Sequence, residues 1–355
     1  MTEEPTSVGV DDGVALAPRP RTAPGAANAA DASRVDSGDE AASAKALEAV
    51  HSFLEKNAAF AAKTVDRYCS ESKKLRALEG FTPRPRSKDA AIFLAGRVDW
   101  ENGRIGMMHL PASITQRMAN PPMSWRNFTP ADYAGLDFGW LSELLVFDHW
   151  SLTGDGPLKD LDSVSASEAP IPNYIDLQNW VKLRLIKGKN EGELAQASVE
   201  VRHLADLCAS SGTMIGEMIR AAMYGIERGV WQAAGLTPPE SLPTSDDVQT
   251  IRHSARAGMY FLFPGVSREV KQKALKCIPA RCAALTEAIG ASASMRPALA
   301  NTDDIDWLLA QEPCDLTLAT SLSRGRPLPL TAVAEGFEGQ LPLEQWMKAL
   351  TDGGL

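Results

Sequence analysis

The chain has 355 residues, of which 44% are hydrophobic, and this length suffices for one large or two ordinary domains with a sizeable core. No apolar run is long enough to span a membrane and the N-terminus lacks the pattern of a signal peptide, so we expect a cytoplasmic protein without a membrane partner. Residues 1–40 hold eight acidic and three basic residues and thus −5 of the net charge of −9. The nearly neutral remainder argues against a nucleic-acid partner, which would favour a basic face.

The first 36 residues have the composition of a disordered tail. Prolines alternate with small and polar residues, and no aromatic side chain occurs before Phe53. Such a segment cannot bury enough apolar surface to offset the entropy of ordering it. We therefore expect a disordered tail over 1–36 and a globular region over 37–355, with a possible sub-boundary near 157–175 or 235–245.

A long helix is predicted to begin at Ser37. Ser37 and Glu40 have the spacing of a capping box, and apolar residues then recur at helical spacing as far as Leu78, before Gly80. The next segment, 89–110, leaves two alternatives open. It fits a short helix, or a small β-hairpin near 90–108 around the turn signal Asn102-Gly103.

The sequence is again helical from Pro130 onward, and the fold class is mainly α with about ten helices. Thr129 before Pro130 predicts a helix start, and the apolar run Phe138–Trp150 predicts a central buried helix. Asp176 is expected to cap the next helix, and Glu193 to start a long helical segment that breaks at 210–212 and ends near Trp231. Further helices are expected to begin near Asp246, Ser267, Pro279, Asp303 and Pro342.

Four glycines lie in this long helical segment at two four-residue spacings: Gly212, Gly216, Gly225 and Gly229. Glycine lowers helix stability, so its presence there indicates close approach by another backbone.

The five cysteines are odd in number and scattered: Cys69, Cys208, Cys277, Cys282 and Cys314. A secreted disulfide framework would be even and dense, and no zinc-ligand spacing occurs. We expect buried thiols that pack as small apolar residues, in agreement with a cytoplasmic location.

Asp148 and His149 are the candidate catalytic pair, because they place polar chemistry at the end of an apolar run. Neighbours in a helix point about 100° apart, so the two side chains are not expected to hydrogen-bond each other. His149 is interpreted first as a residue that caps carbonyls at a helix end, and alternatively as the titrating group of a pocket walled by Trp140 and Trp150.

A second hypothesis is a metal site in the helical core. Glu48 with His51, and Glu200 with His203, form Glu-x-x-His motifs, and two such motifs with two lone glutamates build a ferritin-like di-metal centre. Glu143 and Glu217 would supply the lone carboxylates. The chain order differs from that fold, so coincidence is the favoured interpretation.

A cluster of basic residues lies on the helix that precedes Glu193: Lys182, Arg184, Lys187 and Lys189. Solvation and the helix dipole explain this cluster without a phosphate partner.

The sequence has no Gly-x-Ser-x-Gly elbow, no P-loop and no Rossmann glycine fingerprint. The leading hypothesis is therefore a helical protein that acts through protein–protein contacts or self-association, with no cofactor expected. The alternative is an enzyme or ligand-binding protein with a carboxylate and histidine site in its core, with or without a metal ion.

Overall fold

A computed structural model describes residues 37–72, 87–101, 103–119, 124–153, 158, 164–165, 169–249, 251–252, 264–278, 280–299, 303–311, 314, 316–338 and 345. The chain divides into two compact units, Met1–Ala41 and Ala42–Leu355. Apart from residues 37–41, the described residues belong to the second unit. The tail predicted over 1–36 and the helix start predicted at Pro342 lie outside the described residues.

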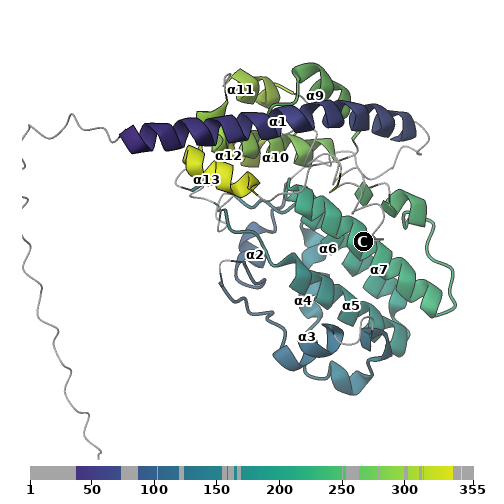
Figure 1. Cartoon of the computed structure of the whole chain (residues 1–355). Helices are drawn as coiled ribbons and strands as arrows, with labels where there is room; N and C mark the ends of the chain where they lie inside the picture. Colours follow the sequence, from purple (N-terminus) through teal and green to yellow (C-terminus); the bar gives the residue numbers. More distant parts are fainter. Residues whose placement is uncertain are drawn as a thin grey trace, which may run out of the picture. The chain divides into compact units, whose positions relative to one another are not determined.

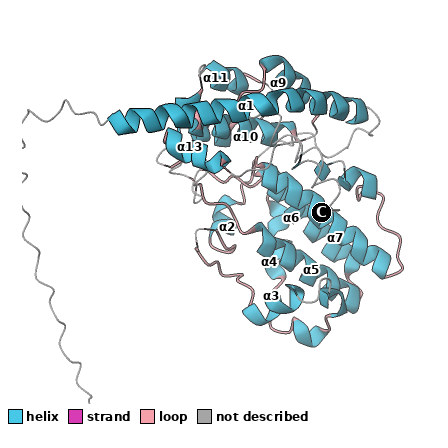
Figure 2. Ribbon diagram, in the orientation of Figure 1, coloured by secondary structure: helices cyan, strands magenta, loops and turns pink. Residues whose placement is uncertain are grey.

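The predicted mainly α fold class is confirmed. Over the described part of the chain Figure 2 shows helices and loops and no strand. The α-helices are α1 (Ser37–Ser72), α2 (Ala91–Ala95), α3 (Ala112–Ala119), α4 (Gly139–Glu143), α5 (Tyr174–Glu191), α6 (Leu194–Ser210), α7 (Met214–Ala233), α9 (Arg268–Leu275), α10 (Arg281–Ser294), α11 (Asp303–Leu309), α12 (Thr317–Arg324) and α13 (Leu330–Phe337). Short 3-10 helices are η1 (Ser124–Asn127), η2 (Pro130–Asp132), η3 (Leu144–Val146) and η5 (Arg296–Ala298), and residues 245–249 and 251–252 are also helical.

None of the described helices has the length and apolar character needed to cross a membrane.

Helices α5, α6 and α7 pack against one another and lie side by side in Figure 1. Asn173 caps α5 by accepting a hydrogen bond from the Asp176 N–H at 3.2 Å, so the predicted cap at Asp176 is wrong by three residues. The break between α6 and α7 lies where the sequence predicted it, and Thr213 caps α7 by accepting from the Gly216 N–H at 3.1 Å.

These three helices line the larger core, whose members include Leu94, Trp140, Val181, Leu204 and Met223. The indole rings of Trp140 and Trp180 lie perpendicular to each other, with centroids 5.7 Å apart. Edge-to-face rings of this kind contribute about 0.5–1.5 kcal/mol beyond the area that they bury. Members of this core lie on both sides of 157–175 and of 235–245, and the sub-boundaries there stay predictions.

A second core joins α1, α9, α10, α11 and α12, with Val65, Leu285, Ile289 and Leu308 among its buried members. Two disulfides lie beside it, Cys69–Cys277 and Cys282–Cys314, with Cα atoms 5.1 Å and 5.5 Å apart. The prediction of unpaired thiols is therefore wrong for four cysteines, and Cys208 is the one that is a free buried thiol. Disulfides persist in oxidising environments, so the cysteines no longer support a cytoplasmic location.

The described residues of the segment 89–110 form α2 and a turn. The Gly103 N–H donates to Trp100 O at 3.0 Å, and Gly103 has the positive φ of 85° that a glycine adopts without strain. Two residues of this segment form isolated β-bridges to other parts of the chain: Asp89 pairs with His149, and Trp100 pairs with Pro172. In the described part of this segment the hairpin alternative is therefore wrong.

The central helix predicted over Phe138–Trp150 is shorter than expected. Helix α4 ends at Glu143, η3 ends at Val146, and Phe147 is extended with ψ of 150°. The Asp148 N–H and the His149 carbonyl bond instead to Lys88 O and to the Ala90 N–H, at 2.9 Å and 2.8 Å. Partners about sixty residues away thus replace the helical hydrogen bonds.

We expect Gly216→Ala to destabilise the protein, because a methyl group there would lie 2.2 Å from the Cys208 carbonyl oxygen of α6. Backbone cannot yield as a flexible side chain does, and overpacking of this kind costs about 1–3 kcal/mol. Gly225→Ala is the matched control. Its nearest contacts are at 3.7 Å and 3.8 Å, and alanine favours a helix over glycine by about 1 kcal/mol. Urea unfolding checks both variants, and equal stability of the two would contradict the close approach at Gly216.

Candidate functional site

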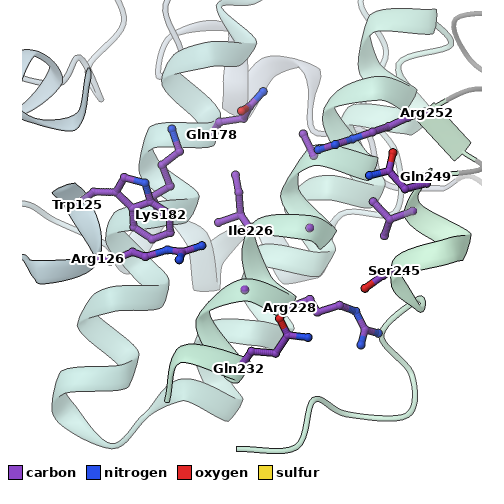
Figure 3. Close-up of a pocket in the computed structure, with 14 residues that line it drawn as sticks. Trp125, Arg126, Gln178, Lys182, Ile226, Arg228, Gln232, Ser245, Gln249 and Arg252 are labelled. Atoms are coloured by element: carbon purple, nitrogen blue, oxygen red, sulfur yellow. The ribbon is translucent and has the colours of Figure 1, made fainter. Parts of the chain in front are cut away.

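A hollow of about 430 Å³ lies over the face of α7 that carries Ala222, Gly225, Ile226 and Gly229. The opposite face of α7 packs into the larger core through Met223 and Val230. Gly225 and Gly229 have no Cβ, so the space above them stays open. Segments distant in the sequence form the walls of this hollow, which we call the basic pocket: η1, α5, and the helical residues 245–249 and 251–252 (Figure 3).

The described charged residues that line the basic pocket are all cations. Arg126, Lys182, Arg228 and Arg252 line it, and none of its described lining residues is acidic. The whole chain carries a net charge of −9, so this group of cations is opposite in sign to the charge of the chain as a whole. Clefts lined by one sign of charge focus the electrostatic field and attract ligands of the opposite sign.

Two of these cations have no carboxylate partner in the described part of the chain. The Arg126 Nε is buried without a hydrogen-bond partner, and the Arg126 guanidinium carbon lies 5.6 Å from the centroid of the Trp125 ring. Lys182 donates to the neutral Asn179 Oδ1 at 3.0 Å. Burial lowers the pKa of Lys182, since an apolar surrounding disfavours its ammonium form. An anion in the pocket would compensate both groups.

The other two cations lie on the far side of the pocket. Arg228 donates from Nε to Pro243 O at 3.0 Å and from Nη2 to Leu242 O at 3.0 Å, so it holds the segment that leads into the helical residues 245–249. The Nη2 of Arg252 comes within 3.7 Å of the position that a Cβ of Gly225 would take. Arg252 therefore extends over α7 toward the pocket (Figure 3).

Neutral polar groups complete the lining. Gln178, Gln232, Gln249 and Ser245 provide amide and hydroxyl groups, and Trp125 and Ile226 provide apolar surface. Amides and hydroxyls both donate and accept hydrogen bonds, whereas they are poor proton-transfer groups near neutral pH. The arrangement therefore suits binding of an anion with hydroxyl groups better than it suits acid–base catalysis.

The basic cluster predicted on α5 divides among three roles. Lys182 lines the basic pocket, Arg184 is buried against Glu200, and Lys187 pairs with Glu191. Burial against Glu200 makes solvation the wrong explanation for Arg184, whereas the explanation of Lys182 by solvation and the helix dipole stays a prediction. The four-residue glycine spacing was the other signal in the sequence. At Gly216 it marks a close helix approach, whereas at Gly225 and Gly229 it opens the pocket.

Asp148 and His149 hydrogen-bond each other, with His149 Nδ1 2.7 Å from Asp148 Oδ1. The expectation that they would not is wrong, because the segment is extended rather than helical, and the helix-end role of His149 is wrong for the same reason. The Asp148 carboxylate also accepts from the backbone N–H groups of Ser87 and Lys88. The His149 hydrogen bond, together with these donors, holds the pKa of Asp148 below its usual range.

This pair fastens two chain segments together. His149 Nε2 also lies 3.6 Å from Asp89 Oδ2, and Asp89 accepts from the Ser151 N–H at 2.9 Å. These contacts hold 87–90 beside 148–151. A catalytic role for Asp148 and His149 stays a prediction, and neither lines the basic pocket.

The residues proposed as metal ligands hold other partners. His51 and His203 donate from Nε2 to Ala298 O and Leu144 O, both at 2.9 Å, and Glu143 lies 3.7 Å from Arg97 Nη2. Glu48 is exposed on α1. Glu200 accepts from Ser142 Oγ and Arg184 Nε, both at 2.6 Å, and Glu217 pairs with Arg220. Among the described residues these side chains do not form a group with metal-ligand spacing.

No family model, curated protein or solved structure matches this chain.

Proposed function

We propose that the protein binds a small phosphorylated molecule in the basic pocket. The observation that carries this proposal is the convergence of Arg126, Lys182, Arg228 and Arg252 on one hollow without an acidic lining residue among those described. Its volume of about 430 Å³ is within the usual range of small-molecule sites. Guanidinium groups match phosphate through paired hydrogen bonds, and a lysine adds a point charge.

The neutral residues that line the pocket indicate which class of phosphorylated ligand fits it. Three glutamine amides and a serine hydroxyl can bind hydroxyl groups, and the indole of Trp125 offers a flat apolar surface. A phosphate ester of a hydroxylated compound, such as a sugar phosphate or a nucleotide, uses all of these groups. Binding rather than turnover is the proposed activity, because the described lining holds no histidine, cysteine or carboxylate.

The test is calorimetric titration of the full chain with inorganic phosphate, pyrophosphate, glucose 6-phosphate and AMP. We expect Arg126→Ala and Lys182→Ala each to weaken binding about tenfold or more, equivalent to about 1.4 kcal/mol. Lys187→Ala is the matched control, since Lys187 lies on the same helix and pairs with Glu191 outside the pocket. Affinities unchanged in both pocket variants, or no binding of any probe to the unaltered chain, would refute the proposal.

The predicted role through protein–protein contacts remains a second candidate. Large apolar side chains that are 67–76% exposed favour it: Ile92, Ile105, Met107 and Ile175. Exposed apolar groups that form contiguous patches are typical of interaction surfaces. Light scattering over a range of concentrations tests self-association, and a monomer at every concentration would restrict this candidate to other proteins.

A further inference from the structure

A second polar site lies where the turn after α2 meets the first turn of α5. Asp99 is buried, His109 is half exposed, and Asp176 is partly buried. His109 Nδ1 lies 2.6 Å from Asp99 Oδ2. One ligand-type atom from each of the three side chains lies within 4.8 Å of the other two. Among the described residues this is the one group of histidine, cysteine and carboxylate side chains with such spacing.

Hydrogen bonds from outside the group position its two carboxylates. The Gly106 N–H donates to Asp99 Oδ1 at 2.7 Å, and Asn173 Nδ2 donates to Asp176 Oδ2 at 3.1 Å. The Asn173 N–H also donates to Asp99 O at 2.7 Å, which joins the two chain segments directly. Outer hydrogen bonds of this kind orient the ligands of metal sites.

The local sequence is adapted to this geometry at Gly106. A Cβ there would lie 2.2 Å from Arg97 O and 2.5 Å from Val98 O. The absence of a side chain lets the turn close tightly, so the Gly106 N–H reaches Asp99 and the chain returns to place His109 beside it.

The charge of the group favours a cation. Two carboxylates lie close together, and the one basic side chain that pairs with either of them in the described part of the chain is His109, which lies 2.6 Å from Asp99 Oδ2 and leaves Asp176 without an ion pair. Neighbouring carboxylates repel each other in a partly buried setting unless a positive charge lies between them.

We propose that Asp99, His109 and Asp176 bind one divalent transition-metal ion, with Zn²⁺ as the preferred ion. One imidazole nitrogen and two carboxylate oxygens are ligands that zinc accepts, whereas Mg²⁺ and Ca²⁺ favour sites made of oxygen alone. Three protein ligands would leave a fourth coordination position for water or another ligand. The site has the composition that the sequence suggested for a metal centre, but it uses other residues and is independent of the basic pocket.

Calorimetric titration of the chelator-treated full chain with ZnCl₂ tests this proposal, with elemental analysis of the dialysed complex to count bound ions. We expect one zinc per chain, and tenfold or greater loss of affinity in both His109→Gln and Asp176→Asn. His51→Gln is the matched control, because His51 is also exposed and donates to a backbone carbonyl elsewhere. Co²⁺ provides a second readout, since its visible absorption should change in His109→Gln and stay unchanged in His51→Gln.

Circular dichroism of each variant separates loss of ligand from loss of fold, and Asp99 is left unaltered because it is buried. Equal zinc affinity in the unaltered chain and in both ligand variants would overturn the proposal. So would the absence of stoichiometric zinc in the unaltered chain.

Discussion

Glu200→Ala is expected to lower the free energy of unfolding by about 3–5 kcal/mol, the usual cost of removing one partner from a buried ion pair. The Glu200 side chain is 2% exposed and lies 2.6 Å from Arg184 Nε, whose own side chain is 6% exposed. Although burial alone would raise the pKa of Glu200, hydrogen bonds from Arg184, Ser142 and Gln196 lower it. The variant leaves a buried guanidinium whose Nη1 already lacks a partner.

Urea unfolding followed by circular dichroism measures this loss. Glu193→Ala is the matched control, because Glu193 lies 3.8 Å from the same arginine but its side chain is 55% exposed. Exposed pairs of this kind contribute at most about 1 kcal/mol. If Glu200 held a metal, as its motif in the sequence suggested, the cost of Glu200→Ala should disappear after chelator treatment. We expect the same cost with and without chelator, and a variant as stable as Glu193→Ala would contradict the structural role.

Removal of the Cys69–Cys277 disulfide should have the other large effect. The bond links residues 208 apart, so it restricts the unfolded chain strongly. We expect the double variant Cys69→Ser, Cys277→Ser to lose about 2–5 kcal/mol. The Cys282–Cys314 bond spans 32 residues, and chain entropy predicts a contribution roughly 1–2 kcal/mol smaller.

Peptide mapping without reductant establishes the pairing, and thermal unfolding of the two double variants compares the bonds. A reducing agent should lower the unfolding temperature of the unaltered chain, whereas Cys208 is a free thiol and contributes no bond. An unfolding temperature that does not respond to reductant would contradict both disulfides.

Long, regular helices could be predicted from the sequence because local signals agree there. The start at Glu193, the apolar periodicity and the break before Thr213 all indicate α6 and α7. The segment Phe138–Trp150 was predicted wrongly, since its apolar run fits a helix while Asp148 bonds to Ser87 and Lys88. Long-range hydrogen bonds of that kind leave no periodic signal in the sequence.

The candidate sites could be predicted from the sequence only in part, for the same reason. The sequence identifies Lys182 as a basic residue on a helix. Arg126 and Arg252 come from segments on either side of it in the chain, so the sequence does not place the three side chains together. Asp99, His109 and Asp176 likewise lie far apart in sequence, without the i, i+3 spacing that drew attention to Glu200 and His203. Side chains that converge through tertiary packing cannot be identified from spacing, and the cysteine pairs were missed for this reason.

The short connections between α5, α6 and α7 have a consequence for the order of folding. Two residues separate α5 from α6, and three separate α6 from α7. Loop closure across such connections has a low entropic cost, so contacts among these helices should form before those that span sixty or two hundred residues. The nascent chain would then build the wall and floor of the basic pocket first. Arg126 from an earlier segment and Arg252 from a later one would complete the ligand site only at the end of folding.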